Sequence, residues 1–161
     1  MSVYFWDTSA LAKYYHQESG TNEVTNLIEA PDAKHFVSQI TLVEMLSVAA
    51  SKVRGDELDE GDFHMFRKVF LFDVKDRMVH VLKTDPSILG KAQKLILAYG
   101  PRKGVGLRTL DGIQLATAHV LRERGLRRFV TSDNRLCLAA EAEGFDVIDP
   151  TKGGNISAGS S

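Results

Sequence analysis

Four acidic residues stand where carboxylates could gather around a metal ion. Each lies in or just before the first turn of a predicted helix, and they are Asp7, Glu44, Asp111 and Asp133. Asp7 follows the apolar run 3–6, which is typical of a strand covered on both faces in a parallel sheet. Ligands of such sheets bind at the carboxyl ends of the strands, where helices that follow strands also begin. The spacing therefore predicts that the four carboxylates converge at one edge of a sheet.

Each acid also has an ordinary structural explanation, because acids at these positions stabilise helix ends. Asp7 and Asp133 could be N-caps, residues 41–44 match a capping box, and Asp111 could complement a helix dipole. Four like charges at one edge, however, repel one another unless a cation lies among them. A set of oxygen ligands suits a hard ion, Mg²⁺ or Mn²⁺, rather than zinc.

Polar side chains flank the first and the last of these acids. The ones that could hold metal-bound water or phosphate oxygens are Thr8, Ser9, Thr131 and Asn134. The alternative is that they only hydrogen-bond the turns in which they lie.

Residues 100–108 combine glycines with cationic side chains, immediately before the helix expected to carry Asp111. Arg102, Lys103 and Arg108 are therefore candidates for contacts with phosphate groups. The stretch is not a P-loop, because no Gly-Lys-Ser/Thr ending follows, and an ordinary surface loop is the alternative.

The histidines and the single cysteine offer no competing site. The five histidines show no H-x-H, H-E-x-x-H or cysteine-partnered spacing, and Cys137 lies beside apolar residues on a predicted helix. The acidic turn 56–62 fails the EF-hand pattern, since Leu58 occupies the third ligand position. Ordinary core or surface roles are expected for all of these residues.

The composition is that of a soluble protein of one domain. The 161 residues include 43% hydrophobic and 25% charged side chains, and no apolar run approaches the roughly 20 residues needed to cross a bilayer. A net charge of −1 gives no general attraction to nucleic acid, so a phosphate-binding surface requires local clusters of cations. With no signal peptide and one cysteine, we expect a cytoplasmic location.

The order of the predicted elements indicates an α/β fold with about five strands in a mostly parallel sheet. Strands are expected at 3–6, 35–40, 78–83, 128–133 and 146–149. Helices are expected between them at 9–15, 21–29, 41–54, 60–73, 86–99, 109–124 and 134–143. We expect one domain at residues 1–150, followed by a disordered Gly/Ser-rich tail at 151–161.

Four motifs, in this order along the chain, resemble those of PIN-domain ribonucleases, and in particular of the VapC toxin branch. They are Asp7-Thr-Ser-Ala-Leu, Glu44 within Thr-Leu-Val-Glu-Met, Leu107-Arg-Thr-Leu-Asp-Gly-Ile-Gln-Leu-Ala-Thr-Ala, and Phe129-Val-Thr-Ser-Asp-Asn-Arg-Leu. The match extends from about residue 3 to residue 149, and the stretch around Asp111 is its most specific part. The segment 55–78 matches no motif of the family.

The resemblance implies a three-layer α/β/α fold and an Mg²⁺- or Mn²⁺-dependent endoribonuclease activity. It also implies frequent homodimers and inhibition by a small antitoxin protein. By motif position, the acidic quartet is Asp7, Glu44, Asp111 and Asp133. We expect Asp7 and Asp111 to bind the metal directly, and the other two acids to act through water. The cations of the 100–108 loop would then contact RNA phosphates.

Two other functions are compatible with the sequence. A PIN-domain nuclease that matures RNA without an antitoxin would carry the same acids. The run Asp7-Thr-Ser9-Ala-Leu11 also resembles the Asp-x-Ser-x-Ser start of a metal-dependent adhesion site, although Leu11 replaces the last serine. Such a module would bind an acidic group of a protein through one ion and would cleave nothing.

Overall fold

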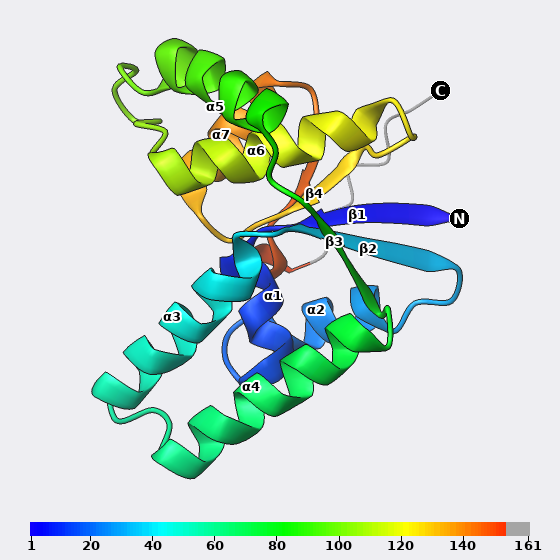
Figure 1. Cartoon of the computed structure of the whole chain (residues 1–161), viewed down its shortest axis with the longest axis vertical. Helices are drawn as coiled ribbons and strands as arrows, with labels where there is room; N and C mark the ends of the chain where they lie inside the picture. Colours follow the sequence, from blue (N-terminus) through cyan, green and yellow to red (C-terminus); the bar gives the residue numbers. More distant parts are fainter. Residues whose placement is uncertain (154–161) are drawn as a thin grey trace.

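The computed structural model describes residues 1–153, which contain five strands and seven α-helices (Figure 1). Their bounds are β1 Ser2–Trp6, α1 Thr8–Tyr15, α2 Thr21–Ile28, β2 Ala33–Ser38, α3 Thr41–Arg54, α4 Glu60–Lys75, β3 Val79–Leu82, α5 Pro86–Tyr99, α6 Thr109–Arg122, β4 Arg128–Val130, α7 Asn134–Ala142 and β5 Asp146–Ile148. The predicted order of elements is confirmed. The strands expected at 35–40 and 128–133 end earlier, because residues 39–40 and 131–133 already turn toward α3 and α7.

The five strands form one parallel sheet in the order β3-β2-β1-β4-β5. β1 is central, and its Phe5 pairs with Phe36 of β2 on one side and with Phe129 of β4 on the other. The chain builds the sheet outward from β1 in one direction as far as β3 and then returns to add β4 beside β1. Ligands of parallel sheets bind in the crevice where the strand order reverses in this way. That point lies at the end of β1, where Asp7 stands.

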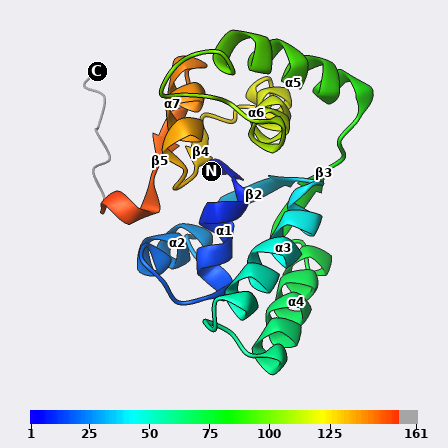
Figure 2. The same ribbon diagram turned by 90° about the vertical axis from the view of Figure 1, so that its left-hand side faces the viewer.

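Two hydrophobic cores cover the two faces of the sheet. Tyr4 and Trp6 of β1 pack with helices α1 to α4, whereas Phe5, which points to the opposite face, packs with α5, α6 and α7. Figures 1 and 2 show the sheet between these two groups of helices. The three-layer α/β/α architecture is therefore confirmed.

Most of the segment 55–78 is helix α4. Helix α4 begins within the acidic turn 56–62. Asp59 is its N-cap, and the carboxylate of Asp59 accepts a hydrogen bond of 2.7 Å from the amide of Asp62. Phe66 and Phe70 are buried in the core, whereas Val69, the residue before Phe70, is 40% exposed. Successive residues are about 100° apart around a helix, so Val69 turns away from the face that its neighbour Phe70 buries.

The carboxyl end of the described chain packs back onto the domain. Residues Pro150–Lys152 form a 3₁₀ helix, so Thr151 and Lys152, which the sequence assigned to the tail, continue the fold. Gly20 has φ +93°, and a Cβ there would lie 2.9 Å from the carbonyl oxygen of Pro150. The rest of the predicted disordered tail, residues 154–161, lies outside the described residues. No helix within residues 1–153 has the length and apolar character needed to cross a membrane.

Candidate active site

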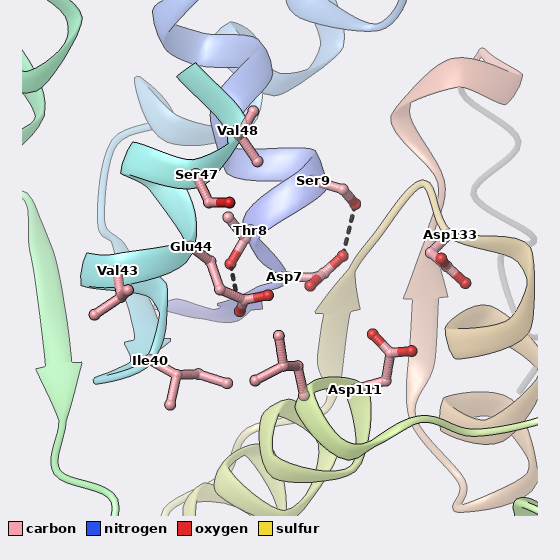
Figure 3. A pocket seen from close by; sticks show the side chains of 11 residues that line it. Asp7, Thr8, Ser9, Ile40, Val43, Glu44, Ser47, Val48, Asp111 and Asp133 are labelled. Atoms are coloured by element: carbon pink, nitrogen blue, oxygen red, sulfur yellow. Dashed lines mark hydrogen bonds between the residues drawn. The ribbon is translucent and has the colours of Figure 1, made fainter. Parts of the chain in front are cut away.

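The four predicted acids lie around one pocket at the carboxyl edge of the sheet (Figure 3). Asp7 follows β1, Glu44 lies in the first turn of α3, and Asp133 immediately precedes α7. The pocket has a volume of about 510 Å³ and is lined by Asp7, Thr8, Ser9, Ile40, Val43, Glu44, Ser47, Val48, Leu110, Asp111 and Asp133. The predicted convergence of the acids is confirmed.

Asp111 reaches this edge by a different route from the other three acids. Its helix, α6, follows α5 and the loop 100–108 rather than a strand. Gly112 allows α6 to lie close against α5, because a Cβ at this position would come within 3.0 Å of the side chain of Ile96. The argument from helices that follow strands therefore accounts for three of the acids but not for Asp111.

Asp7 does not act as a helix cap. It occupies the N-cap position of α1, but its side chain makes no capping hydrogen bond. Its Oδ2 instead accepts hydrogen bonds from the hydroxyls of Ser9 at 2.6 Å and Thr131 at 2.9 Å. Two predicted polar neighbours thus orient this carboxylate, and the capping explanation is wrong for Asp7.

The capping box expected at residues 41–44 is also absent from α3. The N-cap is Ile40, and no side chain caps the helix. The Oε1 of Glu44 accepts hydrogen bonds from the hydroxyl of Thr8 at 3.0 Å and from the amide of Gln114 at 2.7 Å. Glu44 is therefore tied to α1 and α6 rather than to the start of its own helix.

Asp133 is the one acid of the four for which the capping explanation is confirmed. Its Oδ1 accepts hydrogen bonds from the amides of Arg135 at 2.9 Å and Leu136 at 3.0 Å. The neighbouring Asn134, predicted to support the site, accepts a contact of 3.5 Å from the ammonium of Lys152. Asn134 is exposed beside the site and makes no hydrogen bond to the acids within the described part of the chain.

Burial and the charge of neighbouring acids raise the pKa of two of the four carboxyl groups, those of Asp7 and Asp111. Burial raises the pKa of Asp7 to about 6, although the hydrogen bonds from its hydroxyl neighbours oppose this, and the charge of Glu44 adds to the rise. The pKa of Asp111 is also raised to about 6, first by burial and then by the charge of Asp7. Asp133 and Glu44 add to that rise, and the guanidinium of Arg108 opposes it. A cation in the pocket would relieve this repulsion.

The donor set fits a hard cation that keeps part of its water shell. All the charged side chains that line the pocket are carboxylates, and Mg²⁺ and Mn²⁺ favour carboxylate and water ligands. Within residues 1–153 no group of three or more acidic, histidine or cysteine side chains is arranged so that it could hold a metal ion by itself. An ion bound at this edge would need waters to complete its coordination, as Mg²⁺ usually does.

The predicted phosphate-binding cations differ in their distance from the acids. Arg108 lines a second pocket of about 260 Å³, together with Asp111, Asp133, Asn134 and Arg135. The guanidinium of Arg102 lies over the ring of Tyr99, 4.7 Å from its centroid, and Lys103 is exposed in the same loop. The structure therefore brings only Arg108 of the three to the site.

Sequence reasoning missed two residues of the site. Gln114 is buried and hydrogen-bonded to Glu44, and its signal was the spacing of three residues from Asp111, which places both side chains on one face of α6. Arg135 follows Asp133 by two positions and adds a second guanidinium beside Arg108. Gln114 lies in an apolar helix pattern and Arg135 in a capping turn, so neither position indicates a functional role by itself.

A family model of the PIN domain matches residues 4–142. No curated protein matches the sequence significantly. The structure resembles VapC20 from Mycobacterium tuberculosis, described as a sarcin-ricin loop cleaving toxin, with 17% identity and a TM-score of 0.62 over 88% of this chain and 95% of that chain. A toxin-antitoxin complex from Klebsiella pneumoniae has 19% identity and a TM-score of 0.56, covering 91% of this chain and 96% of that chain.

PAE2754 from Pyrobaculum aerophilum has 18% identity and a TM-score of 0.60, covering 91% of this chain and 89% of that chain. At these identities the structural likeness shows a shared fold. The family match covers most of the sequence, including all four acids and the whole of α7. This chain therefore belongs to the PIN-domain family.

Proposed function

We propose that this protein is a metal-dependent endoribonuclease that hydrolyses phosphodiester bonds of RNA. The observation that carries the proposal is the convergence of four carboxylates on one pocket at the switch point of a PIN-domain sheet. The polar side chains that line the pocket are carboxylic acids and alcohols, and no histidine or cysteine that could serve as a nucleophile is among its lining residues. This donor set suits hydrolysis by an activated water, because such hydrolysis requires no side-chain nucleophile.

In this proposal Asp7 and Asp111 hold one or two Mg²⁺ or Mn²⁺ ions directly, and Glu44 and Asp133 act through water. A divalent ion in such a site supplies an activated water and stabilises the charge that develops on the phosphate. The hydroxyls of Ser9 and Thr131 hold Oδ2 of Asp7, so the direction of this ligand is fixed before substrate arrives. Glu44 and Asp133 orient the attacking water relative to the scissile phosphate.

The cations beside the acids bind the phosphates that flank the one being cut. Arg108 and Arg135 line the pocket that adjoins Asp111 and Asp133, and both side chains are exposed. Arg102 and Lys103, farther along the 100–108 loop, would extend this contact along the backbone. Contacts of this type position the nucleic acid without reading its sequence.

We further propose that the protein is the toxin of a VapBC-like toxin-antitoxin pair, acting in the cytoplasm. Two of the structurally similar proteins are described as a toxin and as a toxin-antitoxin complex. The rim of the acidic pocket is apolar, and Val43 and Leu110 are 72% and 48% exposed on it. An antitoxin segment with apolar side chains and a basic residue would complement both the rim and the acids. Homodimer formation stays a prediction.

The decisive experiment for the nuclease proposal compares Asp7→Asn and Asp111→Asn with wild type in cleavage of RNA. Each variant should lose more than about 100-fold in rate with Mg²⁺ or Mn²⁺, because several kcal/mol of charge stabilisation by the metal is lost. Asp146→Asn is the matched control, since Asp146 is exposed at the start of β5 and lies outside the pocket. Wild-type rates in both site variants would show that these acids do not form the active site.

A further inference from the structure

Gln114 of α6 is a buried amide that contacts the acid cluster. Its side chain is 1% exposed. Its Nε2 lies 2.7 Å from Oε1 of Glu44 and 3.1 Å from the hydroxyl oxygens of both Thr8 and Thr41. An amide has two hydrogens for these three acceptors, and a hydrogen bond to a carboxylate is stronger than one to a hydroxyl. The contact with Glu44 is therefore the main one.

This amide joins the two helical layers at the carboxyl edge of the sheet. Thr8, Thr41 and Glu44 belong to α1 and α3, which cover one face, whereas Gln114 belongs to α6 on the other face. Asp111 stands one turn before Gln114 on the same helix. The hydrogen bond from Gln114 to Glu44 therefore fixes Glu44 relative to the helix that carries Asp111.

The other end of the Gln114 side chain is not satisfied. Its Oε1 is buried and has no hydrogen-bond partner within residues 1–153. A buried acceptor without a partner destabilises a fold, and an apolar side chain of the same size would avoid that cost. Turning the amide over would place its carbonyl oxygen against the carboxylate of Glu44. The donor function toward Glu44 is therefore what a glutamine at this position provides.

We propose that Gln114 is a positioning residue of the metal site. Together with Thr8 it holds Oε1 of Glu44, and no donor of the described residues occupies Oε2, which stays available for a metal-bound water. The inference rests on the proposed function, because it assigns Gln114 a part in metal binding by the acidic pocket. Outer partners of this type typically contribute 10- to 100-fold to metal affinity or activity.

The test is the affinity of the RNA-free protein for Mn²⁺, measured by titration calorimetry. Gln114→Met keeps the length of the side chain and removes the donor, and it should weaken Mn²⁺ binding by about 10- to 100-fold. The matched control is Thr117→Val, one turn further along α6. Thr117 is also fully buried, but its hydroxyl bonds Ile113 and Ser38 instead of the acids, so Mn²⁺ affinity should stay within threefold of wild type.

A second measurement shows whether Gln114 acts through Glu44. In a Glu44→Ala background, the addition of Gln114→Met should cause no further loss of Mn²⁺ affinity, because the group that it positions is gone. If Gln114→Met does not give the circular dichroism spectrum of the folded protein, Gln114→Asn replaces it, since the shorter side chain withdraws the same donor. The criterion for this variant is the same.

A loss below threefold in Gln114→Met, an equal loss in Thr117→Val, or an additive loss in the Glu44→Ala background overturns the inference. Wild-type protein that binds no Mn²⁺ and cleaves no RNA overturns both this inference and the proposed function. Wild-type protein that cleaves RNA with metal, while Gln114→Met keeps wild-type Mn²⁺ affinity, overturns this inference alone.

Discussion

Asp7→Asn should stabilise the metal-free protein and at the same time remove its stabilisation by metal. Asp7 is only 6% exposed, and burial raises the pKa of its carboxyl from 3.8 to about 6, although the hydroxyls of Ser9 and Thr131 oppose the rise. A difference of this size corresponds to about 3 kcal/mol of unfolding free energy. In chelator at neutral pH, the charged carboxylate therefore destabilises the folded protein.

The sign of the pH dependence follows from the direction of the shift. A carboxyl whose pKa is higher in the folded protein than in the unfolded chain binds its proton more tightly when folded. The contribution of Asp7 to wild-type stability is therefore most favourable below about pH 4, declines between about pH 4 and 6, and is level above about pH 7. Asn carries no charge, so the difference between variant and wild type should be near zero at pH 4 and largest above pH 7.

Above pH 7 in chelator, Asp7→Asn should gain about 1 to 3 kcal/mol, since the Asn carbonyl oxygen keeps only part of the two hydroxyl hydrogen bonds. The midpoint of thermal unfolding should rise by about 3 to 9 °C. With Mg²⁺ at about 100 times its dissociation constant, wild type should gain about 2.7 kcal/mol and the variant nothing. Equal midpoints at pH 8 in chelator, or an equal gain from Mg²⁺, would refute the reasoning. The exposed control Asp146→Asn should change stability by less than about 0.5 kcal/mol.

Two further predictions concern the RNA and the metal. Replacement of Arg102, Lys103 and Arg108 by Ala should weaken binding of an uncleavable RNA to the Asp7→Asn protein and flatten its log-log salt dependence by up to about three charges; an unaltered slope would show that the loop does not contact the backbone. Cleavage should require Mg²⁺ or Mn²⁺, and Ca²⁺ should bind without supporting turnover, because its looser coordination positions the water poorly. Full activity of the wild type in chelator would contradict the mechanism.

The start of a helix could be predicted well where neighbouring residues in the sequence determine it. Helix α5 begins at Pro86 as expected, because Asp85 caps it with a hydrogen bond of 3.0 Å to the amide of Ile88. The side on which a helix is buried was less predictable. Val69 and Val120 are apolar residues of α4 and α6, yet they are 40% and 42% exposed, since hydrophobicity alone does not say where the neighbouring layer ends.

The site could be predicted as a group of residues, but not the interactions of each. The geometry of a parallel sheet brings together acids at the starts of helices that follow strands, which accounts for Asp7, Glu44 and Asp133 but not for Asp111. Residues 41–44 match a capping box, but Glu44 bonds Thr8 and Gln114 instead. The pattern of a capping box is local, whereas the stronger partners come from other elements of the fold. A long-range partner that bonds a carboxylate outweighs a weak local one.

For Gln114 the sequence indicates that a polar contact exists but does not identify the residue that makes it. In the run 113–118 it stands among apolar and small residues of α6. A single polar residue in such a pattern is easily interpreted as a side chain at the edge of the buried face. A buried amide, however, needs hydrogen-bond partners, and its own helix backbone offers its side-chain donor none. The hydrogen-bond partner had to come from another element, and it is Glu44, 70 residues away in the chain.

The identity of this partner depends on the position of β1 between β2 and β4, since that strand order brings the starts of α3 and α6 to the same edge from opposite faces. A glutamine one turn after a site acid therefore signals a second polar contact of that helix, and the order of the strands decides with which residue.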